Sequence, residues 1–94
     1  MMVFLILTKQ GFNDIKTIAK EINAPIWMGE GVLNEEGLEW YREEENMDIS
    51  NFFYCIDSQD DILCAISSIE EHHPNQTIWI ENLNSLFLVN KGAS

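Results

Sequence analysis

The sequence predicts a small α/β domain in which helices alternate with strands of a mostly parallel sheet. Short apolar runs at residues 3–7 and 52–56 are typical of strands that are buried on both faces. Apolar residues with helical spacing follow each run, at residues 15–22 and 62–69. Because a helix returning across a sheet face is the simplest connection between parallel strands, this alternation favours a layered α/β fold.

In the first part of the chain, we expect a strand at residues 3–7 followed by an amphipathic helix. Asn13 and Asp14 are candidate N-caps of that helix. Its expected apolar stripe comprises Ile15, Ile18, Ala19 and Ile22. Residues 24–28 are apolar and stop at a glycine, which fits either a short strand or a buried loop. Asn34 is expected to cap a second helix that begins at the next residue.

In the second part, residues 52–56 are the most strand-like segment because they are aromatic and β-branched. Ser58, with Asp61 three residues later, is expected to cap a further helix. The buried stripe of that helix should comprise Ile62, Leu63, Ile66 and Ile69. We expect residues 77–80 to form a strand, and residues 86–89 to add another.

The expected order is therefore strand, helix, short strand or loop, helix, strand, helix and strand. This order predicts one domain, residues 1–94, with a sheet of three to five strands and two or three helices. A ferredoxin-like α+β arrangement, in which residues 30–48 are an insertion, is the alternative. The choice depends on whether residues 25–29 form a strand.

Charge excludes some functions and suggests another. The chain has 16 acidic and 5 basic residues among 94, with a formal net charge of −11. Five scattered cations do not form a basic stripe, so direct binding to nucleic acid or to an anionic membrane is not expected. The acidity is regional, because residues 30–81 hold 14 acidic residues and a single basic one, Arg42. Such crowding costs stability, which suggests that the charge has a use.

The sequence also predicts a cellular compartment and some of the buried residues. The opening apolar run lacks a positive flank and is far shorter than the roughly 20 residues of a membrane span, so we expect a cytoplasmic protein. Cys55 and Cys64 are accordingly expected to be small buried hydrophobic residues without a disulfide. Phe53 and Trp79 are also expected in the core.

Residue patterns for catalysis or metal binding are sparse. Asp57, Asp60 and Asp61 follow the aromatic strand-like segment, but the chain has no glycine-rich phosphate loop, so helix capping is the favoured interpretation. An Mg²⁺-dependent regulatory domain is the alternative interpretation. His72 and His73 match no zinc spacing, and no Gly-x-Ser-x-Gly motif is present. We expect no enzymatic activity, no metal and no cofactor.

The densest acidic segment lies on the second predicted helix. Glu35, Glu39 and Glu43 follow at i, i+4 and i+8. On a helix they form one row of carboxylates about 6 Å apart, a spacing similar to that of phosphates along a nucleic-acid strand. The sequence therefore predicts a one-sided acidic face.

Aromatic residues flank this acidic segment. Trp40 and Tyr41 belong to the same predicted helix, and Trp27 precedes it. An aromatic anchor ringed by charge is typical of tight protein interfaces. The expected partner-binding residues are Glu35, Glu36, Glu39, Trp40, Tyr41, Glu43 and Glu44.

Residues 12–45 also carry a pattern that occurs in a known family. An amphipathic helix leads to Ala-Pro-Ile-Trp-Met-Gly-Glu at residues 24–30 and to Leu-Glu-Trp at residues 38–40. This stretch resembles the barstar-type ribonuclease inhibitors, which are acidic cytosolic proteins of similar length and element order. The resemblance implies that helix-borne carboxylates plug the basic active site of a ribonuclease. That family places an acid where this chain has Tyr41, so Glu39 and Glu43 would take its role.

We therefore expect a small acidic inhibitor of the immunity or antitoxin type, which neutralises a basic, nucleic-acid-handling protein through a carboxylate-rich face. The alternatives are a phage-encoded antagonist that mimics DNA and the Mg²⁺-dependent domain. A homo-oligomer paired through the apolar residues Leu86, Phe87 and Leu88 is a further hypothesis.

Overall fold

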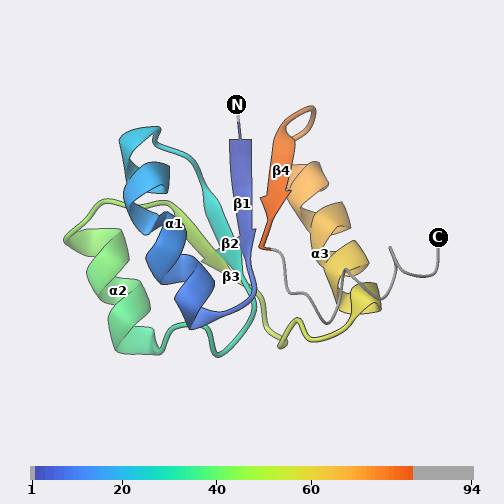
Figure 1. Ribbon diagram of the computed structural model, residues 1–94, viewed down its shortest axis with the longest axis horizontal. Coiled ribbons are helices and arrows are strands. Elements are labelled where there is room, and N and C mark those ends of the chain that lie inside the picture. The colour runs from blue at the N-terminus through green and yellow to red at the C-terminus, as the bar shows by residue number, and fades with distance from the viewer. Residues whose placement is uncertain (1, 82–94) are drawn as a thin grey trace.

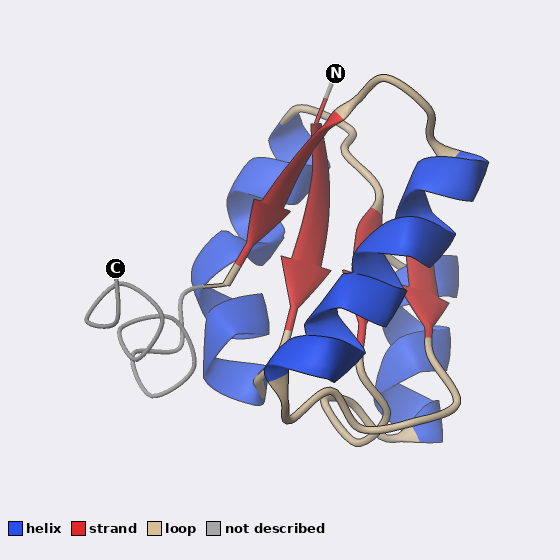
Figure 2. Ribbon diagram, turned by 90° about the vertical axis from the view of Figure 1, so that its right-hand side faces the viewer, coloured by secondary structure: helices blue, strands red, loops and turns tan. Residues whose placement is uncertain are grey.

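The computed structural model describes residues 2–81, which fold into a parallel sheet between two layers of helices. The elements are β1 (Met2–Ile6), α1 (Lys9–Glu21), β2 (Ile26–Met28), α2 (Glu35–Glu43), β3 (Ile49–Asn51), α3 (Gln59–His72) and β4 (Thr77–Ile80). The four strands lie in the order β3-β2-β1-β4, and all are parallel (Figure 2). Helices α1 and α2 cover one face and α3 covers the other (Figure 1).

The predicted α/β class is confirmed, and the ferredoxin-like alternative is wrong. A ferredoxin-like sheet contains antiparallel pairs, whereas every strand pair here is parallel. Residues 26–28 form a strand that pairs with β1 on one side and with β3 on the other. The segment at 30–48 is therefore an integral crossover through α2 and not an insertion.

The central strand β1 explains why its sequence is apolar without alternation. Phe4 and Ile6 pack with α1 and α2 in one hydrophobic cluster. Val3 and Leu5 point to the opposite face and pack with α3 in a second cluster. Because helices cover both faces, every position of the strand beyond the first is buried.

Helix α1 begins four or five residues before the predicted caps. Thr8 is its N-cap, and the Thr8 hydroxyl accepts a hydrogen bond from the Gly11 N–H at 3.0 Å. Asn13 and Asp14, the predicted caps, are exposed positions within the helix. The earlier start is stabilised by Phe12, which is fully buried against the sheet.

The buried stripe of α1 also differs from the prediction. Ile15 and Ala19 are buried as expected, and Phe12 completes the stripe. Phe12, Ile15 and Ala19 define the side of α1 that faces the sheet. Ile18 and Ile22 lie away from that side and are about half exposed. This arrangement leaves the two isoleucines on the flank of α1.

The prediction of a strand at residues 52–56 is wrong, because the third strand is Ile49–Asn51. The strand pairs with β2 from Ile49 onward, and the Phe52 N–H donates to the Met28 carbonyl at 2.9 Å. The chain then leaves the sheet, because β2 also ends at Met28. Phe53, which was expected in the core, is 98% exposed.

Helix α3 has the predicted cap and most of the predicted stripe. The Ser58 hydroxyl accepts a hydrogen bond from the Asp61 N–H at 3.1 Å. The buried residues of the helix are Ile62, Ala65 and Ile69. Leu63 is about half exposed, contrary to the prediction, because the fully buried Ala65 sets which side of the helix faces the sheet.

Three other side chains expected in the core lie elsewhere. Cys55 and Cys64 are both exposed, because one follows β3 in a loop and the other precedes Ala65 on the outer side of α3. Trp79 is partly exposed and packs edge-on against Phe4, with ring centroids 5.5 Å apart. The predicted strand at 86–89 and the oligomerisation residues Leu86, Phe87 and Leu88 lie outside the described residues.

Within residues 2–81, no helix has the length and apolar character that crossing a membrane requires.

Candidate protein-binding site

Helix α2 is fixed in the fold by its cap and by two contacts on its inner side. The Asn34 side-chain carbonyl accepts a hydrogen bond from the Gly37 N–H at 2.7 Å, as the sequence predicted. Leu38 is buried, and Tyr41 packs edge-on against Phe12 of α1 with ring centroids 4.8 Å apart. These contacts determine which side of α2 faces solvent.

The outer side of α2 carries the predicted binding residues. The exposed ones are Glu35, Glu36, Glu39, Trp40, Glu43 and Glu44. Helical spacing arranges them as two adjacent rows, in which Trp40 is the only residue that is not a glutamate. Tyr41, the remaining predicted residue, is half-buried and packs on the core side of the helix.

Trp40 is held in place although half of its surface is exposed. Its exposed fraction is 51%, and its ring meets the Tyr41 ring edge-on with centroids 4.9 Å apart. Glu36 and Glu44 lie one helical turn before and after it. The result is an aromatic surface flanked by carboxylates and supported by a half-buried ring beneath.

The cations nearest to this face have other partners. Lys20 pairs with Glu45 at 2.8 Å, and the Arg42 Nε donates to the Ile49 carbonyl at 2.9 Å. The Lys16 ammonium lies 3.3 Å from the Tyr41 hydroxyl. Within residues 2–81 the Lys20–Glu45 pair is the only ion pair, so the five glutamates of the exposed face have no cationic partner there.

Two hollows border the face, one on each flank of α2. The hollow toward α1 has a volume of about 320 Å³ and is lined by Lys16, Thr17, Lys20, Trp40, Tyr41, Glu45 and Met47. The larger one, which we name the Phe53 groove, has a volume of about 670 Å³ and is lined by Glu35, Leu38, Glu39, Arg42, Glu43, Asn51 and Phe53.

Sequence reasoning missed the Phe53 groove. The aromatic composition of residues 52–56 placed Phe53 in a buried strand, and Asn51 carried no signal of its own. The positions of both side chains are set by where β3 ends, because the chain turns away from the sheet directly after that strand. The end of β3 is in turn set by its pairing with β2, which the sequence does not show.

Trp27 does not join the acidic face. It lies on the α3 side of the sheet, where its ring packs against Phe52 with centroids 5.2 Å apart. The rings of His72 and His73 lie 5.2 and 6.0 Å from the same ring. The histidines therefore contact an aromatic cluster, and the His72 Nδ1 lies 3.0 Å from the Ser68 carbonyl oxygen.

The three aspartates before and within the start of α3 act at the helix terminus. The Asp61 carboxylate accepts a hydrogen bond from the Asp57 N–H at 3.3 Å. This bond, and then the Ser58 hydroxyl, lower the pKa of Asp61 from its usual value because they stabilise the ionised form. Among residues 2–81, no three His, Cys, Asp or Glu side chains are grouped so as to hold a metal ion.

Comparison with known proteins does not add a family assignment. No family model, curated protein or solved structure matches this chain. The resemblance of residues 12–45 to barstar-type inhibitors therefore stays a prediction.

Proposed function

We propose that this protein is a small acidic inhibitor of the immunity or antitoxin type, which acts in the cytoplasm by binding a basic, nucleic-acid-handling protein. It is a binding protein and not an enzyme. The observation that carries the proposal is the exposed side of α2, where five glutamates without cationic partners among residues 2–81 surround the half-exposed Trp40.

The chemistry of such a face fits a basic protein partner. Proteins that handle nucleic acids bind phosphates through clustered Lys and Arg side chains. A helix that presents carboxylates at regular spacing offers the same cations an alternative set of acceptors. Trp40 supplies apolar area at the centre, which is the usual position of the residues that contribute most to binding.

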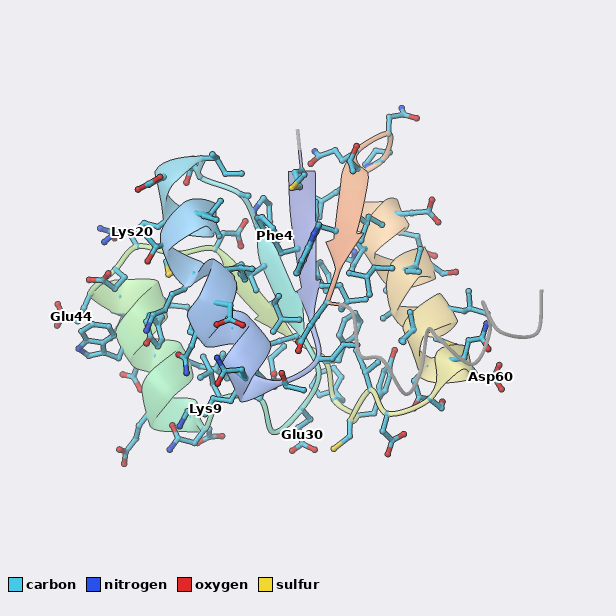
Figure 3. All side chains as sticks on the ribbon, in the orientation of Figure 1. Phe4, Lys9, Lys20, Glu30, Glu44 and Asp60 are labelled. Carbon is cyan, nitrogen blue, oxygen red and sulfur yellow. The ribbon has the colours of Figure 1, made fainter. Side chains whose placement is uncertain are left out.

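The test compares two variants with the same change of charge. Glu39→Lys with Glu43→Lys reverses charge on the exposed face of α2. The matched control, Glu70→Lys with Glu71→Lys, reverses two exposed carboxylates on α3. The helices lie on opposite sides of the sheet, as the labelled Glu44 of α2 and Asp60 of α3 show (Figure 3). Circular dichroism checks that both variants fold.

We expect the immobilised wild-type protein and the α3 control to retain one basic protein from a lysate of the native host, and the α2 variant to lose it. The retained protein, once purified, should lose nuclease activity when the wild-type protein is added. Equal retention by both variants would contradict the proposal, as would a retained protein whose nucleic-acid chemistry is unaffected.

The row of Glu35, Glu39 and Glu43 also favours a second candidate, a phage-encoded antagonist that mimics DNA. Its carboxylates are about 6 Å apart, close to the phosphate spacing of a nucleic-acid strand. A DNA mimic should displace duplex DNA from several unrelated DNA-binding proteins, whereas an immunity-type inhibitor should recognise one cognate protein. A competition assay with labelled duplex DNA separates the two.

A further inference from the structure

The Phe53 groove lies between α2 and the segment that follows β3, beside the exposed glutamate face. Its volume of about 670 Å³ is roughly twice that of the hollow on the other flank of α2. Leu38, which is buried, contributes apolar surface to its lining. The groove lining therefore combines an apolar side chain with polar and charged ones, and is not only a charged surface.

The charge in this groove is negative. Three of its lining residues are Glu35, Glu39 and Glu43, and a single cation, Arg42, also lines it. Arg42 donates through Nε to the Ile49 carbonyl at 2.9 Å, which holds its side chain along the outer edge of β3. The carboxylates outnumber the guanidinium and have no ion-pair partner within residues 2–81.

Two further residues add features that a simple charged surface lacks. Phe53 is 98% exposed, so both faces of its ring are open to a planar group. The Asn51 Oδ1 is buried and has no hydrogen-bond partner among the described residues. Buried oxygen atoms usually have a donor, so the polar contacts of Asn51 are incomplete in this part of the groove lining.

We propose that the Phe53 groove binds an arginine side chain of the basic partner. A guanidinium is planar and always charged, has five N–H donors and stacks on aromatic rings. It can donate to the glutamate carboxylates while its plane lies against Phe53. An ammonium is a compact point charge without a plane to stack, so lysine fits this set of groups less well. This inference rests on the proposed function and names the group that the partner contributes.

The test uses hexa-arginine and hexa-lysine peptides as probes, with binding followed by NMR at about 50 mM NaCl. We expect hexa-arginine to bind several-fold more tightly than hexa-lysine and to shift the signals of Asn51 and Phe53. Phe53→Ala should weaken hexa-arginine binding about two- to fivefold and should remove the preference over hexa-lysine, because a cation over an exposed ring contributes on that scale.

Leu63→Ala is the matched control, since it truncates another exposed apolar side chain, on α3, without changing charge. It should leave binding of both peptides unchanged. Phe53 is almost fully exposed, so Phe53→Ala is expected to fold normally. Equal affinity for the two peptides, an unaffected Phe53→Ala variant, or shifts centred on Trp40 would each overturn the inference.

The failure of this inference is distinguishable from the failure of the proposed function, because Phe53→Ala changes no charge. If the captured partner is lost by Glu39→Lys with Glu43→Lys but binds Phe53→Ala as tightly as the wild type, the groove inference is wrong and the function stands. If no basic partner is captured but hexa-arginine binds in a Phe53-dependent way, the function is wrong and the arginine preference of the groove stands.

Discussion

Glu81 binds the start of α1 at the position where an open α/β sheet usually holds its ligand. Ligands of such sheets gather at the carboxyl ends of the strands where the strand order reverses, which here is between β1 and β4. The Glu81 carboxylate accepts hydrogen bonds from the Leu7 and Thr8 N–H groups, both at 2.8 Å, and from the Thr8 hydroxyl. A carboxylate of the chain itself thus occupies the helix N-terminus.

Gly11 is coupled to this contact, because a Cβ at Gly11 would lie too close to the Glu81 Oε1 for both to keep their positions. We predict that Gly11→Ala lowers the free energy of unfolding by about 1–2 kcal/mol, since the carboxylate must leave its donors. In a Glu81→Ala background the same substitution should raise that free energy by about 0.5–1 kcal/mol, because alanine favours a helix over glycine. Urea unfolding of the four proteins measures both values, and additive effects would contradict the coupling.

At the scale of elements, α2 carries its glutamates at a cost to stability. Glu43 and Glu44 lie at the C-terminal end of the helix, where negative charge opposes the helix dipole. Glu43 also lies one turn after Glu39 on the same side of the helix, which adds repulsion. A helix with such charges is more readily explained if the charges serve binding.

We predict that Glu43→Gln with Glu44→Gln raises the free energy of unfolding by about 0.5–1 kcal/mol at low salt. The gain should shrink at 0.5 M NaCl, where the charges are screened over a few ångströms. Glu36→Gln removes one charge from the first turn, where the dipole favours it, and should give no gain. Thermal unfolding at the two salt concentrations measures the difference, and a double variant no more stable than the wild type would contradict this reasoning.

The elements that the sequence predicted correctly are those whose ends are set locally. Asn34 and Ser58 cap their helices through hydrogen bonds to residues three positions later, so the signal lies within one turn. The start of α1 and the position of β3 depend on distant partners instead. Phe12 is buried by packing that includes Tyr41, and Ile49 is chosen as a strand residue by pairing with Ile26.

The candidate site divides in the same way. The exposed glutamates of α2 could be predicted because helical spacing alone places them on one side. The Phe53 groove could not, since Asn51 and Phe53 approach α2 only through the end of β3. Trp27 flanks the acidic segment in the sequence, but strand alternation directs it to the opposite face of the sheet.

For the whole molecule, the sheet separates two acidic sides that have different roles in the proposed binding. Both α2 and α3 bear exposed carboxylates, and the net charge is −11. A field of this size attracts a basic protein from any direction. In the proposed complex, the contacts that persist after the encounter should involve only the face that carries Trp40 and borders the Phe53 groove. Attraction and retention are thus expected to depend on different parts of the molecule.

This separation predicts distinct kinetic effects for the two charge-reversal variants against the captured partner. Glu39→Lys with Glu43→Lys and Glu70→Lys with Glu71→Lys change the net charge equally, so both should lower the association rate by up to about tenfold at 20 mM NaCl. The difference from the wild-type association rate should nearly vanish at 0.5 M NaCl. Only the α2 variant should raise the dissociation rate, by about 100-fold, because it removes contacts within the complex. Stopped-flow mixing measures the association rate, and surface plasmon resonance measures the dissociation rate. An equal rise in the dissociation rate for both variants would mean that the bound state depends on total charge and not on the α2 face.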